Sequence, residues 1–290
     1  MEEYNCLVIL GATATGKTRL AVDEALRRDG EIISADSRQV YKGLDIGTGK
    51  DLKEYGSVPY HLIDIRELKD EYNVFEFQQD VYSIFPQILE RSRFPIIAGG
   101  TPLYLDSILS SYNLIPVPED NEFRRQAETM TTEELGLELL SLNPNLHNKT
   151  DLHDRMRAIR AIEIARYKRT IQTSPLGKAS SSLIKPRIIG IHFEKDELER
   201  RIYSRLLSRL DEGMIEEVES LHNAGADWEY LESLGLEYRF TAQYLQGKIE
   251  TKDEYISILF RHICKFAKRQ RTWFRKMERR GIEIEWIQRK

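Results

Sequence analysis

Residues 11–18, Gly-Ala-Thr-Ala-Thr-Gly-Lys-Thr, have the spacing of a phosphate-binding loop. The pattern G-x-x-x-x-G-K-[ST] surrounds phosphate oxygens with backbone N–H groups, and its last two residues supply an ammonium group and a hydroxyl. The residues that we predict to bind a diphosphate or polyphosphate are Gly11, Ala12, Thr13, Ala14, Thr15, Gly16, Lys17 and Thr18. Thr18 is also the predicted protein ligand of a Mg²⁺ ion at that phosphate.

Two further polar residues follow apolar runs. Asp36 comes after Ile32–Ser34, and Thr101 comes after Phe94–Ala98 and a glycine pair. In an open α/β sheet, ligands lie at the carboxyl ends of the strands. Asp36 has two interpretations that the pattern leaves open: a helix N-cap or Mg²⁺ partner, or a general base that faces the phosphate site. Thr101 is expected to cap the next helix, to contact a ligand, or to do both.

Basic residues gather in two later segments. The segment from Glu197 to Leu221 carries Arg200, Arg201, Arg205 and Arg209. Most such arginines form surface ion pairs, but one that returns beside the core would bind pyrophosphate with its planar fork. From Lys268 to Arg280 there are seven Lys or Arg residues and one acid, interleaved with aromatic residues. A solvated helix face and a nucleic-acid surface both remain open for this run.

Arg157 and Arg160 lie one turn apart on an expected helix. A solvated face with Arg–Glu pairs is favoured over a phosphate-contacting face, because nothing else in this stretch points to a ligand. The glycine-rich stretch Gly43–Lys50, taken by itself, is expected to be a plain connector.

The elements that must position these residues follow from apolar periodicity. The expected strands are Cys6–Leu10, Ile32–Ser34, Phe94–Ala98 and Arg187–Phe193, with a short strand or turn at Tyr60–Ile65. The expected helices are Arg19–Arg28, Tyr72–Arg91, Leu103–Leu109, Glu197–Leu221 with an interruption at Gly213, and Glu254–Arg280. This alternation predicts an α/β fold with a parallel sheet.

The character of the chain changes at Ser110–Asp120, which contains two prolines. The stretch from Asn121 to Tyr167 is helical in pattern, and Lys168–Lys185 is expected to be a loop. We therefore predict a P-loop NTPase-like parallel sheet core, formed by residues 1–116 and 186–290 with C-terminal helices. A helical insertion domain occupies residues 117–185.

Composition limits the class of protein. The 290 residues are 41% hydrophobic and 31% charged, and the formal net charge is −4. No apolar run approaches the roughly 20 residues needed to cross a bilayer, and no secretory signal is visible at the first residues. The two cysteines, Cys6 and Cys264, form no C-x-x-C pair, so neither a disulfide framework nor a zinc site is supported. These features predict a cytoplasmic protein without a membrane partner.

Taken as a set, the motifs resemble those of the bacterial-type tRNA dimethylallyltransferase (tRNA isopentenyltransferase) family, nearly end to end. The stretches that carry the resemblance are residues 11–18, 33–41, 43–48, 61–64, 99–104, 157–163 and 267–275. The phosphate loop alone is shared with many kinases. Ser34-Ala-Asp-Ser37, Asp45-Ile-Gly-Thr48 and the ending Lys268-Arg-Gln-Arg-Thr-Trp-Phe-Arg275 are far more specific.

The resemblance implies an enzyme that moves a dimethylallyl group from dimethylallyl diphosphate to N6 of the adenosine 3′ of the anticodon in tRNA, with release of pyrophosphate. It implies Asp36 as the base and Thr101 beside the reacting centre. Arg205, with Lys17 and Thr18, would hold the diphosphate and its Mg²⁺. The target base must be flipped out of the anticodon loop to reach the core.

The resemblance also implies the tRNA contacts. The residues predicted to bind tRNA are Asp36, Ser37, Arg38, Gln39, Arg124, Met156, Arg157, Arg160, Lys268, Arg269, Gln270, Arg271, Trp273 and Arg275. Family precedent implies a monomer. The chain departs from the family pattern at Gly49–Asp51, where Ala-Lys-Pro is usual, at Pro102, and over Gly235–Phe240, so no role is transferred to that last segment.

Three other functions account for part of these features. A relative that prenylates free adenine nucleotides needs neither the helical insertion nor the basic helix. A small-molecule kinase or other P-loop NTPase shares Lys17 and Thr18 but has no use for an arginine-aromatic ending. The third alternative is a nucleic-acid-binding module that has lost catalysis. The intact Lys17, Thr18 and Asp36 argue against it.

Overall fold

The computed structural model describes residues 4–112, 114–144, 152, 154–170 and 183–288. The chain divides into two compact units, Met1–Tyr112 with Ala179–Lys290, and Asn113–Lys178. The limits of the insertion predicted from the sequence are residues 117 and 185. Most of the loop expected at 168–185 lies outside the described residues.

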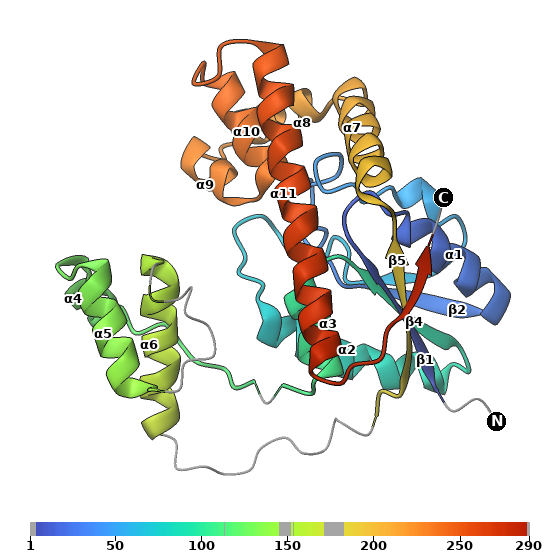
Figure 1. Ribbon diagram of the computed structural model, residues 1–290, viewed down its shortest axis with the longest axis horizontal. Helices are drawn as coiled ribbons and strands as arrows, with labels where there is room; N and C mark the ends of the chain where they lie inside the picture. The colour runs from blue at the N-terminus through green and yellow to red at the C-terminus, as the bar shows by residue number, and fades with distance from the viewer. Residues whose placement is uncertain (1–3, 113, 145–151, 153, 171–182, 289–290) are drawn as a thin grey trace. The chain divides into compact units, whose positions relative to one another are not determined.

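The first unit contains a six-stranded sheet, and every strand pair in it is parallel (Figure 1). The strand order is β3-β2-β4-β1-β5-β6. The strands are β1 (Cys6–Gly11), β2 (Gly30–Ser34), β3 (Tyr60–His61), β4 (Phe94–Gly99), β5 (Pro186–His192) and β6 (Glu285–Gln288). The predicted parallel α/β sheet is therefore confirmed, while the edge strand β6 was not predicted.

Helices cover both faces of this sheet. Leu7 and Ile9 of β1 pack in a core cluster with α1 (Lys17–Arg28). Val8 and Leu10 pack in a second cluster with α2 (Val74–Glu90) and α3 (Pro102–Leu109). Successive side chains of a strand point to opposite faces, so a strand buried on both faces is apolar throughout. This explains the uninterrupted Cys-Leu-Val-Ile-Leu run before the phosphate loop.

The C-terminal part of this unit is helical. The helices after β5 are α7 (Lys195–Asp211), α8 (Met214–Asn223), α9 (Trp228–Ser233), α10 (Leu236–Leu245) and α11 (Lys252–Arg279). Gly213, with a φ of 101°, separates α7 from α8 and confirms the predicted interruption. Helices α9 and α10 were not predicted from the sequence. Helix α11 is 28 residues long and packs against α3, α7 and α10 (Figure 1).

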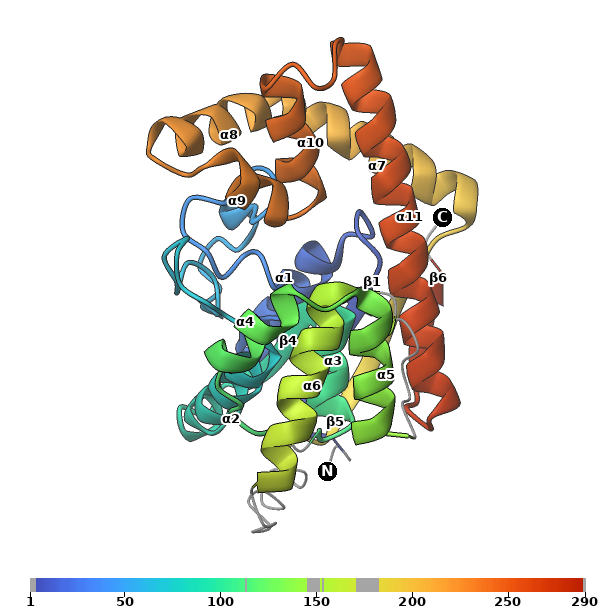
Figure 2. The same cartoon turned by 90° about the vertical axis from the view of Figure 1, so that its left-hand side faces the viewer.

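The second unit is a group of three described helices with a core of its own. They are α4 (Asn121–Glu128), α5 (Thr132–Leu142) and α6 (Arg155–Thr170), and α5 lies beside α6 (Figure 2). Phe123, Leu135, Leu139 and Ile162 are buried together between them. The predicted helical character of this stretch is confirmed. Within the part of the chain that the structure describes, no helix has the length and apolarity needed to cross a membrane.

Candidate active site

The carboxyl ends of β1, β2 and β4 meet at one edge of the sheet, and a polar pocket lies there. Its volume is about 250 Å³. The residues that line it include Thr13, Ala14, Gly16, Lys17, Thr18, Asp36, Gln39, Thr48, Asp51, Glu54, Gly100, Arg201 and Arg205. The structure thus brings together the predicted phosphate loop, Asp36 and Arg205, which are far apart in the sequence.

The phosphate loop is closed by its own side chains. The Thr15 hydroxyl donates to the Ala12 carbonyl at 2.8 Å, and Lys17 Nζ donates to the same oxygen at 2.7 Å. Gly16 has a φ of 77°, and α1 begins at the next residue. The N–H groups of this first turn have no partner within the helix, so they are available to an anion. Burial of the Lys17 ammonium lowers its pKa to about 8.

Asp36 and Thr101 stand on neighbouring loops. Asp36 Oδ1 accepts hydrogen bonds from the N–H groups of Arg38, at 2.9 Å, and Gln39, at 3.4 Å. The carboxylate therefore closes a turn after β2, and it does not cap an α-helix. Thr101 Oγ1 accepts from the Ser37 N–H at 3.0 Å. Thr101 occupies the N-cap position of α3 without capping it through its side chain, so its hydroxyl ties the two loops together.

Helix α7 brings three arginines to the same edge. Arg201 Nε donates to the Ala14 carbonyl of the phosphate loop at 3.0 Å. Arg205 lines the pocket, and its guanidinium lies 3.5 Å from Asp51. Burial and the neighbouring Arg209 lower the pKa of Arg205. Arg209 bonds both oxygens of Asp51, at 2.6 and 2.5 Å, and its Nε has no partner among the described residues.

The glycine-rich stretch 43–50 is an anchored loop, so its expected role as a plain connector is wrong. Glu217 accepts bonds from three consecutive N–H groups of the loop, at 3.0, 2.6 and 3.1 Å. Lys50 is 1% exposed, and its ammonium bonds the Tyr41 carbonyl at 2.7 Å and Asp45 at 2.6 Å. This anchoring holds the end of the loop, and Asp51 after it, beside the pocket.

The predicted tRNA-binding residues of α11 divide between two environments. Lys268, Arg269 and Arg275 are exposed, whereas Gln270 is buried. Trp273 Nε1 donates to Asp106 of α3 at 3.0 Å. Phe274 is fully buried. The alternation of basic and aromatic residues therefore reflects two faces of one helix rather than an exposed stacking surface.

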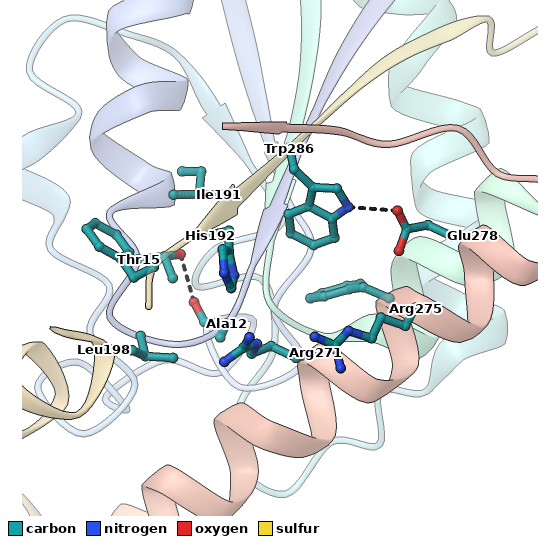
Figure 3. A pocket seen from close by; sticks show the side chains of 11 residues that line it. Ala12, Thr15, Ile191, His192, Leu198, Arg271, Arg275, Glu278 and Trp286 are labelled. Atoms are coloured by element: carbon teal, nitrogen blue, oxygen red, sulfur yellow. Dashed lines mark hydrogen bonds between the residues drawn. The ribbon is translucent and has the colours of Figure 1, made fainter. Parts of the chain in front are cut away.

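A second cavity, of about 230 Å³, lies beside the phosphate loop between α11, β5 and β6. Arg271 and Arg275 extend from α11 toward His192 and Trp286 around it (Figure 3). Trp286 Nε1 donates to Glu278 at 2.7 Å, which fixes the indole at the cavity wall.

Two of the four predicted tRNA-binding residues in the second unit, Arg124 and Arg160, contact one buried acid. Glu163, 2% exposed, accepts bonds from Arg124 at 2.7 Å and Arg160 at 2.7 Å. The favoured expectation of Arg–Glu pairing is thus confirmed for Arg160. Arg157 faces solvent near Asp154, and Met156 is 65% exposed.

Comparison with known proteins decides the family. A family model described as "IPP transferase" matches residues 39–277. The chain belongs to the IPP transferase family. A second model, described as "Isopentenyl transferase", matches residues 4–70, which include the phosphate loop.

Relatives within the IPP transferase family match this chain over nearly its whole length. The protein named tRNA dimethylallyltransferase 2 of Treponema denticola is 56% identical over 99% of the chain and 96% of its own length. The tRNA dimethylallyltransferase of Treponema pallidum is 52% identical, over 98% of the chain and 91% of its own length.

Solved structures share the fold of this IPP transferase chain. The tRNA isopentenylpyrophosphate transferase of Bacillus halodurans aligns with a TM-score of 0.69 at 33% identity, covering 98% of this chain and 90% of that one. A eukaryotic dimethylallyltransferase described as acting on tRNA aligns with a TM-score of 0.78 at 21% identity. It covers 98% of this chain and 73% of its own, and at that identity the likeness concerns the fold alone.

Several pocket residues of this IPP transferase were not predicted from the sequence. Arg201, Asp51 and Glu54 line the pocket, but no role was assigned to the acids and Arg201 was not distinguished from its neighbours. The departure from the family pattern at Gly49–Asp51 was the sequence feature that could have marked Asp51 as a pocket residue. It did not reveal the partner, because Arg209 lies 158 residues away in the chain.

Proposed function

We propose that the protein transfers a dimethylallyl group from dimethylallyl diphosphate to N6 of the adenosine 3′ of the anticodon in tRNA, and releases pyrophosphate. The observation that carries this proposal is that one pocket combines the phosphate loop, Arg205 and Asp36 in a chain of the IPP transferase family. The names of relatives at 56% and 52% identity support tRNA as the substrate.

The proposed reaction breaks the bond between C1 of the dimethylallyl group and the diphosphate oxygen. The electron pair of that bond goes to the diphosphate, whose growing charge Lys17, Arg205 and the loop N–H groups would stabilise. N6 of the adenosine forms the new bond to C1 and loses a proton. Asp36, on the adjacent loop, is the proposed acceptor of that proton. Thr101 would hold this loop through Ser37.

We also propose a Mg²⁺ ion at the diphosphate. Among the described residues, no group of three or more His, Cys, Asp or Glu side chains could hold a metal ion. A Mg²⁺ ion at a phosphate needs few protein ligands, because phosphate oxygens and water complete its shell. The Thr18 hydroxyl, in the pocket beside Asp36, fits that need. The ion would neutralise charge on the leaving diphosphate.

We propose that the anticodon loop contacts Asp36–Gln39. The exposed Lys and Arg side chains of α11, and Arg157 and Met156 of the second unit, are the other proposed RNA contacts. Such contacts act mainly on phosphates and position the target nucleotide. We further propose that the protein acts in the cytoplasm, where tRNA is, and as a monomer.

The test combines purified protein, Mg²⁺ and dimethylallyl diphosphate with either tRNA that lacks the modification or AMP, followed by nucleoside mass spectrometry. The expected result is a prenyl mass on adenosine from tRNA and none on AMP. Asp36→Asn is expected to bind pyrophosphate at least as tightly as the wild type does, because a negative charge is removed from the pocket, and to lose transfer by about 100-fold or more. Product from AMP alone, or no prenyl product from either substrate, would refute the proposal.

A further inference from the structure

Helix α11 buries a regular stripe of side chains that contains one polar residue. Ile263, Ala267, Gln270, Phe274 and Met277 are each at most 7% exposed, and they follow a spacing of three and four residues. Four of them are apolar members of the two core clusters of this unit. An unpaired polar group at such a position destabilises a core, so the placement of Gln270 requires partners.

Both halves of the Gln270 amide have such partners. Its Oε1 accepts from the Thr13 N–H in the phosphate loop at 2.9 Å, and its Nε2 donates to the Gly100 carbonyl at 2.6 Å. A Cβ at Gly100 would lie 2.9 Å from that Nε2, so the bond depends on the absence of a side chain there. A buried carboxamide satisfied on both sides fixes the distance between the two loops that it joins.

The Gly100 loop continues directly into the proposed reacting centre. Thr101 is the next residue, and its N–H donates to the Ala35 carbonyl at 3.2 Å. Its hydroxyl accepts from the Ser37 N–H at 3.0 Å. Thr101 therefore bonds the residue before Asp36 and the residue after it. A continuous path of hydrogen bonds and backbone therefore runs from the phosphate loop through Gln270 to the loop of Asp36.

We infer that Gln270 is a positioning residue, which sets the phosphate loop relative to Thr101 and Asp36, and that it is not a tRNA contact. This inference rests on the proposed function for the identity of the bound diphosphate. Because Gln270 occupies the Thr13 N–H, the diphosphate is bound by the later N–H groups of the loop and by Lys17.

The test uses Gln270→Met in the full chain, which keeps the length of the side chain and removes both hydrogen bonds. Calorimetry with pyrophosphate and Mg²⁺, without RNA, is expected to give an affinity about tenfold lower than that of the wild type. The prenyl-transfer kcat also falls, since the two loops lose their spacing. The dissociation constant for tRNA is expected to stay within about twofold, because the residue faces inward.

The matched control is Gln78→Met. Gln78 of α2 is 2% exposed, and its Nε2 donates to the carbonyls of Ser107 and Tyr112, both at 2.9 Å. The same substitution thus removes buried bonds to backbone atoms away from the phosphate loop. It is expected to lower the thermal midpoint while the pyrophosphate affinity stays within about twofold.

A second variant, Gly100→Ala, disrupts the hydrogen bond between Gln270 and the Gly100 carbonyl by changing Gly100. It keeps the inference testable if Gln270→Met fails to fold. In Gly100→Ala the new methyl displaces the Gln270 amide, while Lys17 Nζ, at 3.4 Å, is in ordinary contact. The same pattern of weaker pyrophosphate binding and unchanged tRNA binding is expected. Wild-type pyrophosphate affinity in the folded variants, or a loss confined to tRNA binding, would overturn the inference. A wild-type protein that binds pyrophosphate but modifies no RNA would refute only the proposed function.

Discussion

At the scale of single residues, the phosphate loop combines charge with burial. Lys17 is half-buried at the wall of the pocket and donates to a carbonyl of its own loop. Its pKa of about 8 compares with 10.5 for the free side chain, and burial is the main cause. The charged form still predominates at pH 7, but it is less favoured than in the free side chain. An anion in the pocket would favour it again, so this residue is expected to respond to both pH and diphosphate.

Lys17 is expected to make stability depend on pH in a defined window. Between pH 8 and 10.5 the unfolded chain binds more protons at this residue than the folded chain does. The free energy of unfolding therefore rises with pH there, by at most about 1.4 kcal/mol per unit. Urea unfolding of wild type and Lys17→Met at several pH values checks this. The variant should be the more stable near pH 7, and the gap should shrink from pH 8 upward. A gap that does not change with pH would contradict the assignment.

Asp51 is expected to compete with diphosphate for the arginines of α7. It bonds Arg209 and lies 3.5 Å from Arg205, so a second anion in the pocket is repelled by its charge. Asp51→Asn keeps the shape and removes the charge. We expect pyrophosphate to bind on the order of fivefold more tightly to the variant, as measured by calorimetry in EDTA. Weaker binding would mean that Asp51 serves mainly to hold the arginines in place.

At the scale of elements, the two faces of α11 have different roles. Its inner stripe joins the core and contacts the phosphate loop, while Lys268 and Arg269 face solvent. The helix is also fixed to α3 through Asp106, which accepts from Trp273 at 3.0 Å and Tyr112 at 2.7 Å. A rigid helix with an exposed basic face is suited to hold an RNA backbone at a set distance from the pocket.

The double variant Lys268→Glu, Arg269→Glu is expected to weaken tRNA binding without affecting pyrophosphate. Two lost phosphate contacts lower the slope of log K against log salt by about two, since each contact releases roughly one counterion. Binding titrations at several salt concentrations measure this slope. The control is Arg279→Glu, which should change the slope much less. Arg279 is an exposed arginine in the last turn of the same helix. Equal effects from both variants would contradict a localised RNA contact.

At the scale of the whole molecule, the chain contains two units that each have a hydrophobic core. The pocket residues all belong to the first unit. The second unit is built around Glu163, which pairs with Arg124 and Arg160. Separate cores predict that damage to one unit leaves the local structure of the other intact.

Glu163→Ala is expected to destabilise the second unit alone. Removal of the acid leaves two guanidinium groups without their buried partner, at an expected loss of about 3 kcal/mol in local stability. Hydrogen exchange should therefore speed up in α4 and α6 and stay unchanged in β1 and α1. Pyrophosphate affinity is expected to be preserved while tRNA modification falls. Glu122→Ala, an exposed acid on α4, is the control. Loss of pyrophosphate binding in Glu163→Ala would show that the units are not independent.

The sequence by itself determined the features that depend on neighbouring residues. Gly11–Thr18 is a contiguous motif, so its spacing already specifies a loop between β1 and α1. Apolar runs such as Phe94–Ala98 specified parallel strands, whose carboxyl ends must meet at one edge. The positions of Asp36 and Thr101 at that edge follow from the same rule. Gly213 marked the break between two helices, since it tolerates a positive φ.

Only the tertiary structure decided which side chains face solvent and which form hydrogen bonds or ion pairs with distant parts of the chain. The helical pattern could not tell that Gln270 faces the phosphate loop while Lys268 faces solvent, because that depends on where the partner at Gly100 lies. The pairing of Asp51 with Arg209 spans 158 residues of sequence. Periodicity describes one element at a time, whereas a hydrogen bond between elements requires the packing of both.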